Sequence, residues 1–135
     1  MDRLKERLEM AEKALGSFQD LPLGKNVDDI VRDAAIQRFE YTFEAVWKAA
    51  KLYLREKEGL EQGSPKGVVR ACLQSGILTD GQARLALELV DDRNLTVHAY
   101  NEELAKRIFS HLNDYAELMA DWLSEMQEKN SRVKA

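Results

Sequence analysis

Residues 36–54, IQRFEYTFEAVWKAAKLYL, decide the fold that the rest of the chain has to complete. Large apolar side chains recur along this stretch at steps of three and four, which is the spacing of one helix face. Tyr41, Ala45 and Leu52 lie on a second flank of the same helix. A helix that is apolar on two sides is central in its own core or packs on a partner as well. The pattern therefore predicts a central helix over residues 26–57.

Helical patterns flank this segment on both sides. The apolar positions of a first helix recur at steps of four and three; they are Leu4, Leu8, Ala11, Leu15 and Phe18. Pro65 is suited to the first turn of a short third helix, and Gly76 is suited to its end. Thr79 is a plausible cap for a fourth helix, and the last helix begins near Asn101 and keeps an apolar stripe as far as Trp122.

Long period-two alternation, the mark of strands, is absent from the sequence. Five helices with short connections predict an all-α fold, an antiparallel four-helix bundle with one additional short helix. A length of 135 residues fits a single domain, and the polar end of the sequence predicts a frayed tail over residues 127–135. The low content of glycine (7) and proline (2) argues against a many-stranded sandwich or barrel.

Charge and cysteine content limit the function classes. A net charge of −4 argues against a general binder of phosphate backbones but leaves room for a local basic site. Cys72 is the single cysteine, so no internal disulfide is possible and a reducing, cytoplasmic location is expected. The charged N-terminus argues against a signal peptide, and the lack of a long apolar run argues against a membrane span.

Common cofactor and metal motifs are missing from the sequence. It contains no GxxxxGK[ST] phosphate loop, no GxGxxG fingerprint and no HExxH pair. One cysteine and two histidines make a poor set of zinc ligands, so neither a metal nor a cofactor is predicted.

Residues 91–100, DDRNLTVHAY, place an arginine, an amide, an imidazole and a phenol close together. On one continuous helix Arg93 and His98 would point about 140° apart. Two interpretations follow: the helix breaks across residues 95–97, or the side chains converge with copies from a second subunit. A third interpretation needs no site, because Arg93 could pair with Asp91 or Asp92 while His98 closes a helix end.

The sequence Arg93-Asn94-x-x-x-His98-x-Tyr100 resembles the R-polar-x3-H motif of the HEPN superfamily, named for nucleotide-binding proteins of higher eukaryotes and prokaryotes. The tyrosine two residues after the histidine is typical of its HepT-like branch. Further blocks are similar to a subgroup described as nucleotidyltransferase substrate-binding proteins; they are residues 37–48, 64–66 with 69–70, and 76–80. Together these blocks span most of residues 1–125. One departure is Arg84, where the subgroup pattern suggests a tryptophan nearby.

The resemblance implies a homodimeric partner of a minimal nucleotidyltransferase, with a metal-independent endoribonuclease site in a cleft between two subunits. It implies that His98 is the acid or base, that Arg93 stabilises charge on the phosphate, and that Asn94 orients it. Tyr100 matches the tyrosine that the partner enzyme adenylylates in some family pairs. Two alternatives stay open: a non-catalytic subunit that binds a nucleotide or substrate, and a purely structural helical partner.

Other residues have simpler interpretations. Lys66 and Arg70 lie in a stretch without acidic residues and could attract RNA or a nucleotide, although a solvated face is the better interpretation. His111 falls within the apolar stripe of the last helix, so packing at a core or an interface is expected. The periodicity also predicts core positions for Trp47, Trp122 and Cys72.

Overall fold

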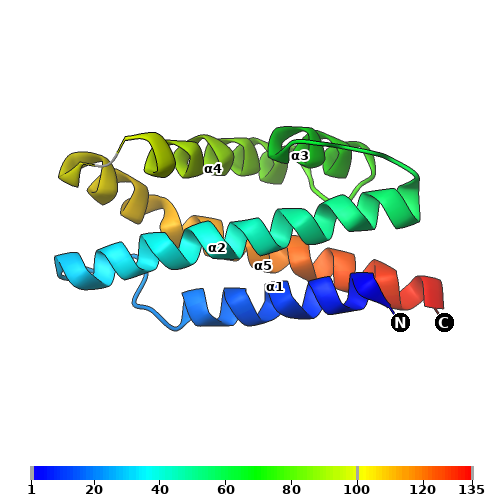
Figure 1. The fold of residues 1–135 in the computed structure, drawn as a ribbon, viewed down its shortest axis with the longest axis horizontal. Helices are drawn as coiled ribbons and strands as arrows, with labels where there is room; N and C mark the ends of the chain where they lie inside the picture. Colours follow the sequence, from blue (N-terminus) through cyan, green and yellow to red (C-terminus); the bar gives the residue numbers. More distant parts are fainter. Residues whose placement is uncertain (1, 100, 135) are drawn as a thin grey trace.

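The computed structural model describes residues 2–99 and 101–134, and this part of the chain is helical and contains no strand (Figure 1). Its helices are α1 (Arg3–Gln19), α2 (Asp29–Tyr53), α3 (Pro65–Gln74), α4 (Asp80–His98) and α5 (Glu102–Lys134). A π-helical turn, η1 (Leu54–Glu58), extends α2.

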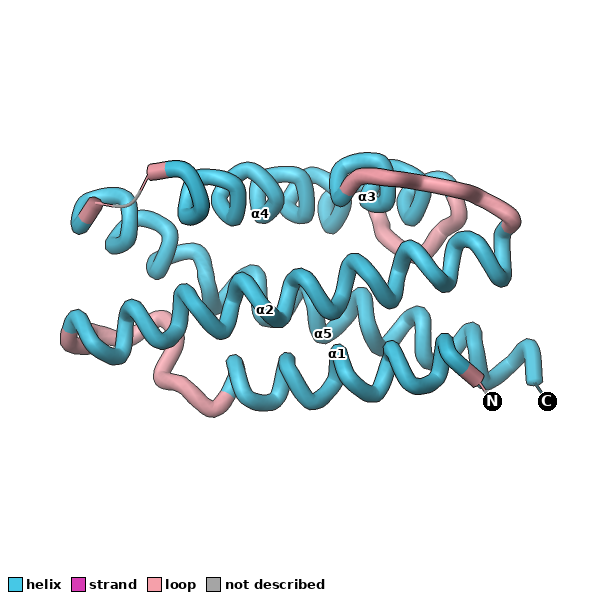
Figure 2. The backbone as a smooth tube through the Cα atoms, viewed as in Figure 1, coloured by secondary structure: helices cyan, strands magenta, loops and turns pink. Residues whose placement is uncertain are grey.

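The long helices α1, α2, α4 and α5 alternate in direction along the chain, as the colour gradient in Figure 1 shows. Figure 2 shows the connection from α1 to α2 toward one end of the bundle, whereas the connection from η1 to α3 starts at the other end and runs back over α3. The helix α2 packs against α1, α5 and α3, while α4 packs against α3 and α5. The predicted antiparallel four-helix bundle with one extra short helix is therefore confirmed, as is the central position of the second helix.

Local signals fix most helix ends. The Asp28 side chain caps α2, two residues after the predicted cap at Asn26. Thr79 and Gln82 form a reciprocal capping box at the start of α4. Asn101 accepts a hydrogen bond from the backbone of Leu104, 2.8 Å away, at the start of α5. Each of these helix starts therefore has a polar side chain that satisfies an otherwise unpaired backbone N–H.

The predicted frayed tail is wrong, because α5 continues to Lys134. Gln127 donates a hydrogen bond to the carboxylate of Glu12 on α1, and Asn130 is only 6% exposed. The polar composition of this segment misled the prediction, because polar residues can line a helix that still packs along one face. The helix therefore continues through residues 127–134, and it packs against the rest of the bundle as far as Asn130.

Of the interpretations left open for residues 91–100, the one in which the helix breaks across residues 95–97 is wrong. The helix α4 passes through these residues without interruption and ends at His98. The Thr96 hydroxyl donates to the carbonyl of Arg93, 2.7 Å away, so a β-branched side chain is accommodated by bonding back to the preceding turn. Tyr100 lies outside the described residues.

One apolar core joins all five helices. The stripe predicted for α1 is buried in full, and Trp122 and Tyr115 are among the largest fully buried side chains. Cys72 is buried as predicted, and burial raises the pKa of its thiol to about 12. Trp47 differs from its prediction: it packs against the edge of the core and keeps part of its surface exposed. Among the described helices, none is long and apolar enough to cross a membrane.

Candidate functional site

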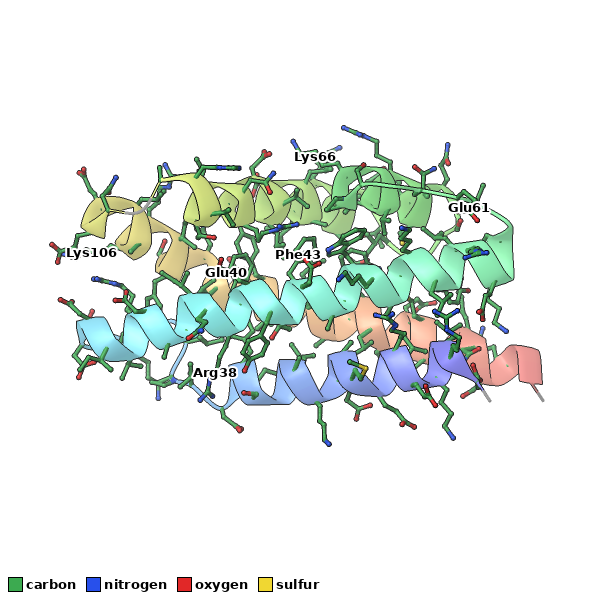
Figure 3. The ribbon with its side chains drawn as sticks, viewed as in Figure 1. Arg38, Glu40, Phe43, Glu61, Lys66 and Lys106 are labelled. Atoms are coloured by element: carbon green, nitrogen blue, oxygen red, sulfur yellow. The ribbon has the colours of Figure 1, made fainter. Side chains whose placement is uncertain are left out.

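Arg93 points from α4 toward α2, where two side chains hold its guanidinium. One Nη atom lies 4.0 Å from a carboxylate oxygen of Glu44, and the guanidinium carbon lies 5.6 Å from the centre of the Phe43 ring. Figure 3 shows Phe43 in the space between α2 and α4. Only 21% of the Arg93 side chain is exposed. The expectation that Arg93 would pair with Asp91 or Asp92 is therefore wrong, since its partner is on another helix.

The carboxylate of Glu44 connects several groups on this face of the bundle. It accepts a hydrogen bond from the indole of Trp47 at 3.1 Å and pairs with the ammonium of Lys48 at 3.1 Å. Partial burial alone would raise the pKa of Glu44, but these two contacts and the positive charge of Arg93 together lower it. Glu44 therefore stays ionised, orients the Trp47 ring through a hydrogen bond and lies close enough to attract the Arg93 guanidinium.

Asp92 faces the opposite side of α4 and is buried against α5. It accepts a hydrogen bond of 2.5 Å from the Tyr115 hydroxyl and lies 3.0 Å from Nδ1 of His111. Burial, followed by the hydrogen bond to Asp92 and its charge, raises the pKa of Tyr115 above its usual range. Asp92 therefore anchors the motif-bearing end of α4 to α5. The His111 side chain is 45% exposed, so it lies at the rim of the core and not inside it.

Asn94 and His98 are exposed on α4, and His98 occupies its last turn. Because Arg93 and His98 share one continuous helix five residues apart, they point in different directions, and one chain does not bring them together. Two apolar side chains on the same stretch, Leu95 and Val97, are 38% and 59% exposed.

Lys66 pairs with Asp91 at 2.7 Å, which ties the start of α3 to α4 two residues before Arg93. Figure 3 shows Lys66 on the outer side of α3 and α4. Arg70 is exposed and forms no ion pair with any residue that the structure describes. Lys66 is therefore near the motif along α4, whereas Arg70 is simply available to solvent. Within the described chain, no group of three or more potential ligand side chains is arranged to hold a metal ion.

The sequence did not single out Glu44, Asp92 or His111 as parts of the site. Carboxylates are numerous in this chain, and the spacing of Glu44 on α2 does not distinguish it from a solvated one. The sequence does hint at the contacts of Asp92, because His111 and Tyr115 are four residues apart and share one helix face. Nothing in the sequence, however, indicates that this face packs against Asp92.

Comparisons with known proteins match nearly the whole chain. The family model described as "Nucleotidyltransferase substrate binding protein like" matches residues 6–128. The probable ribonuclease HepT of Haemophilus influenzae is 26% identical over 108 residues, which cover 77% of this chain and 73% of that protein.

Two solved structures are also similar. A protein from Thermus thermophilus is 59% identical with a TM-score of 0.83, covering 87% of this chain and 98% of that one. A tri-AMPylated HEPN toxin of Shewanella oneidensis, solved in complex with an MNT antitoxin, is 18% identical with a TM-score of 0.77. That match covers 95% of this chain and 99% of the toxin, so the bundle has the HEPN fold.

Replacing Asp92 tests whether this carboxylate anchors the end of α4. Asp92→Ala leaves the buried Tyr115 hydroxyl without its acceptor, and we expect a loss of about 2–3 kcal/mol in the free energy of unfolding. Urea denaturation followed by circular dichroism measures this loss. Asp91→Ala is the matched control, because its exposed ion pair should contribute less than about 1 kcal/mol. Equal effects of the two substitutions would show that Asp92 is not an anchor.

Proposed function

Because the chain belongs to the family of nucleotidyltransferase substrate binding protein-like chains, we propose that it is a cytoplasmic, HepT-like partner of a minimal nucleotidyltransferase. We propose further that it acts as the toxin of a toxin–antitoxin pair, as a metal-independent endoribonuclease. The observation that carries the proposal is the half-buried Arg93, held by Glu44 and Phe43 beside the exposed Asn94 and His98. The relatives named above, a probable ribonuclease and a toxin bound to its MNT antitoxin, support the same function.

In this mechanism His98 accepts the proton of a ribose 2′-hydroxyl, since an imidazole exchanges protons near neutral pH. The 2′ oxygen then attacks the adjacent phosphorus, and the bond from phosphorus to the 5′ oxygen breaks. The 5′ oxygen leaves with a proton from an imidazolium or from solvent, so the products are a 2′,3′-cyclic phosphate and a 5′-hydroxyl. Arg93 stabilises the charge that develops on the phosphate oxygens, and Asn94 orients the phosphate.

The proposed site is shared by two chains. Arg93 and His98 diverge on α4, so one copy cannot direct both at the same phosphate. A homodimer that pairs the motif-bearing ends of α4 would bring the Arg93 of one copy to the His98 of the other. It would also cover the exposed Leu95 and Val97.

A second candidate is a non-catalytic subunit that holds a nucleotide or another substrate for the nucleotidyltransferase. The description of the matched family favours it, as does the net charge of −4, which is unusual for a strong RNA binder. The same Arg93 and His98 would then bind a phosphate without cleaving RNA. Lys66 could contribute a further positive charge, and Arg70 lies on the same helix.

Cleavage of single-stranded RNA in the presence of EDTA separates the two candidates. We expect His98→Ala and Arg93→Ala each to lower the rate about 100-fold or more, with products that end in 2′,3′-cyclic phosphates. Arg84→Ala, which removes an exposed arginine from the same helix, is the control and should retain full activity. Cleavage that EDTA abolishes would rule out the mechanism, and full activity in both motif variants would rule out the site. An inactive wild-type protein that binds nucleotides would favour the second candidate.

Adenylylation of Tyr100 is a separate proposal about control by the partner. An AMP group two residues after His98 would place a negative charge beside the phosphate site and exclude RNA. We expect incubation with ATP and the cognate nucleotidyltransferase to raise the intact mass by at least one AMP unit. Tyr100→Phe should remove that adduct, whereas Tyr41→Phe, which alters an exposed tyrosine on α2, should keep it. Peptide maps without AMP on Tyr100 would show that control acts through binding alone.

A further inference from the structure

A basic cavity of about 320 Å³ lies on the side of the bundle formed by the N-terminal half of α1 and the C-terminal half of α2. Five cationic side chains, one indole, one leucine and one carboxylate line it: Arg3, Arg7, Lys48, Lys51, Arg55, Trp47, Leu52 and Glu61. Figure 3 shows Glu61 at the end of the bundle where both chain termini lie. No sequence motif pointed to this cavity.

The cations of the cavity are only partly neutralised. Lys48 pairs with Glu44, and Arg55 pairs with Glu61. The remaining three, Arg3, Arg7 and Lys51, form no ion pair within the part of the chain that the structure describes. In a chain of net charge −4, such a local excess of positive charge favours an anionic ligand.

The indole of Trp47 supplies a flat apolar wall. Its Nε1 donates to Glu44 at 3.1 Å, which fixes the ring along α2, and part of the ring remains exposed in the cavity. A rigid aromatic face beside arginine and lysine side chains is the combination that binds single-stranded nucleic acid, because bases stack on the ring while phosphates pair with the cations. A protein surface rich in carboxylates would pair with the cations, but its acidic side chains have no flat ring to stack on the indole.

One side chain, Glu44, contacts both Trp47 in the wall of the cavity and Arg93. The Glu44 oxygen that accepts from Trp47 is also the oxygen nearest to Arg93. From Glu44, the positive charges of Lys48, Lys51 and Arg55 follow at steps of four, three and four, so they lie along one face of α2 and its π-helical extension. This row extends about 16 Å from Glu44 at the rise of an α-helix.

We propose that the cavity is a secondary RNA-binding site that holds a single-stranded segment flanking the cleavage position, with a base on Trp47 and phosphates on Arg7 and Lys51. The proposal rests on the RNase function proposed above, because it places the reacting phosphate at Arg93. It adds the path of the RNA strand, which leaves the cleavage position along α2 toward the N-terminal half of α1.

The test measures binding of a fluorescein-labelled 12-nucleotide 2′-O-methyl RNA by anisotropy over a series of salt concentrations. This probe cannot be cleaved through its 2′ position, so the result does not depend on RNase activity. The test variant is the double substitution Arg7→Gln and Lys51→Gln. Its matched control is Lys5→Gln with Lys13→Gln, which removes two charges from the outer surface of α1 and leaves the cavity intact.

The cavity variant should bind more weakly than the control. The slope of its plot of log affinity against log salt should be shallower by about 1.4, because two phosphate contacts are lost.

Stacking of a base on Trp47 should quench the fluorescence of this indole. The quenching should be absent in Trp47→Phe, since the other tryptophan, Trp122, is fully buried. The proposal is overturned if the cavity variant matches the control. It is also overturned if ATP at equal phosphate concentration quenches the Trp47 fluorescence as strongly as RNA does. A variant that loses binding to the cognate nucleotidyltransferase but keeps its affinity for RNA would overturn it as well.

Discussion

The broad buried face of α2, which runs from Ala35 to Tyr53, is the constraint on which the rest of the bundle depends. One helix cannot cover a face of this width, so α1, α5 and α3 each pack on α2. The helix α4 rests on α3 and α5, and its Arg93 side chain contacts Phe43 and Glu44 of α2. A residue of the proposed site is therefore also a structural link between two helices.

Because Arg93 both links two helices and belongs to the proposed site, its packing explains how a small bundle could hold a phosphate-binding arginine in position. The guanidinium lies over the Phe43 ring and beside a carboxylate that stays ionised, so few of its rotamers remain accessible. Asp92 secures the same end of α4 from the other side through Tyr115 and His111. With the backbone of α4 held on two sides, Asn94 and His98 can remain exposed without losing their orientation.

Periodicity and capping residues were sufficient to predict most of the fold. The stripe on α1, the proline in the first turn of α3, the cap at Thr79 and the stop at Gly76 are local features, each decided within one or two helical turns. The wrong predictions arose where local composition was overruled by packing. The polar end of α5 stays helical because it lies along α1, and residues 95–97 stay helical although two of them are β-branched.

The site was predictable only as a motif. Its Arg93, Asn94 and His98 are close in sequence, whereas Glu44 and His111 reach it through tertiary packing that no local pattern encodes. The basic cavity was missed for the same reason, because its cations come from two segments that are distant along the chain, residues 3–7 and 48–55. Residue spacing can identify a chemical group, but it cannot identify which partner from a distant helix lies beside that group.

The claim that two copies share one site is tested most directly by mixing two inactive variants. Arg93→Ala and His98→Ala proteins are each assayed alone and then together, after partial unfolding and refolding to exchange subunits. A shared site predicts that the mixture regains about a quarter of the wild-type cleavage rate, because half of the dimers then contain one intact Arg93–His98 pair. A mixture that stays as inactive as either variant, although mass spectrometry shows mixed dimers, would contradict a site built from two copies.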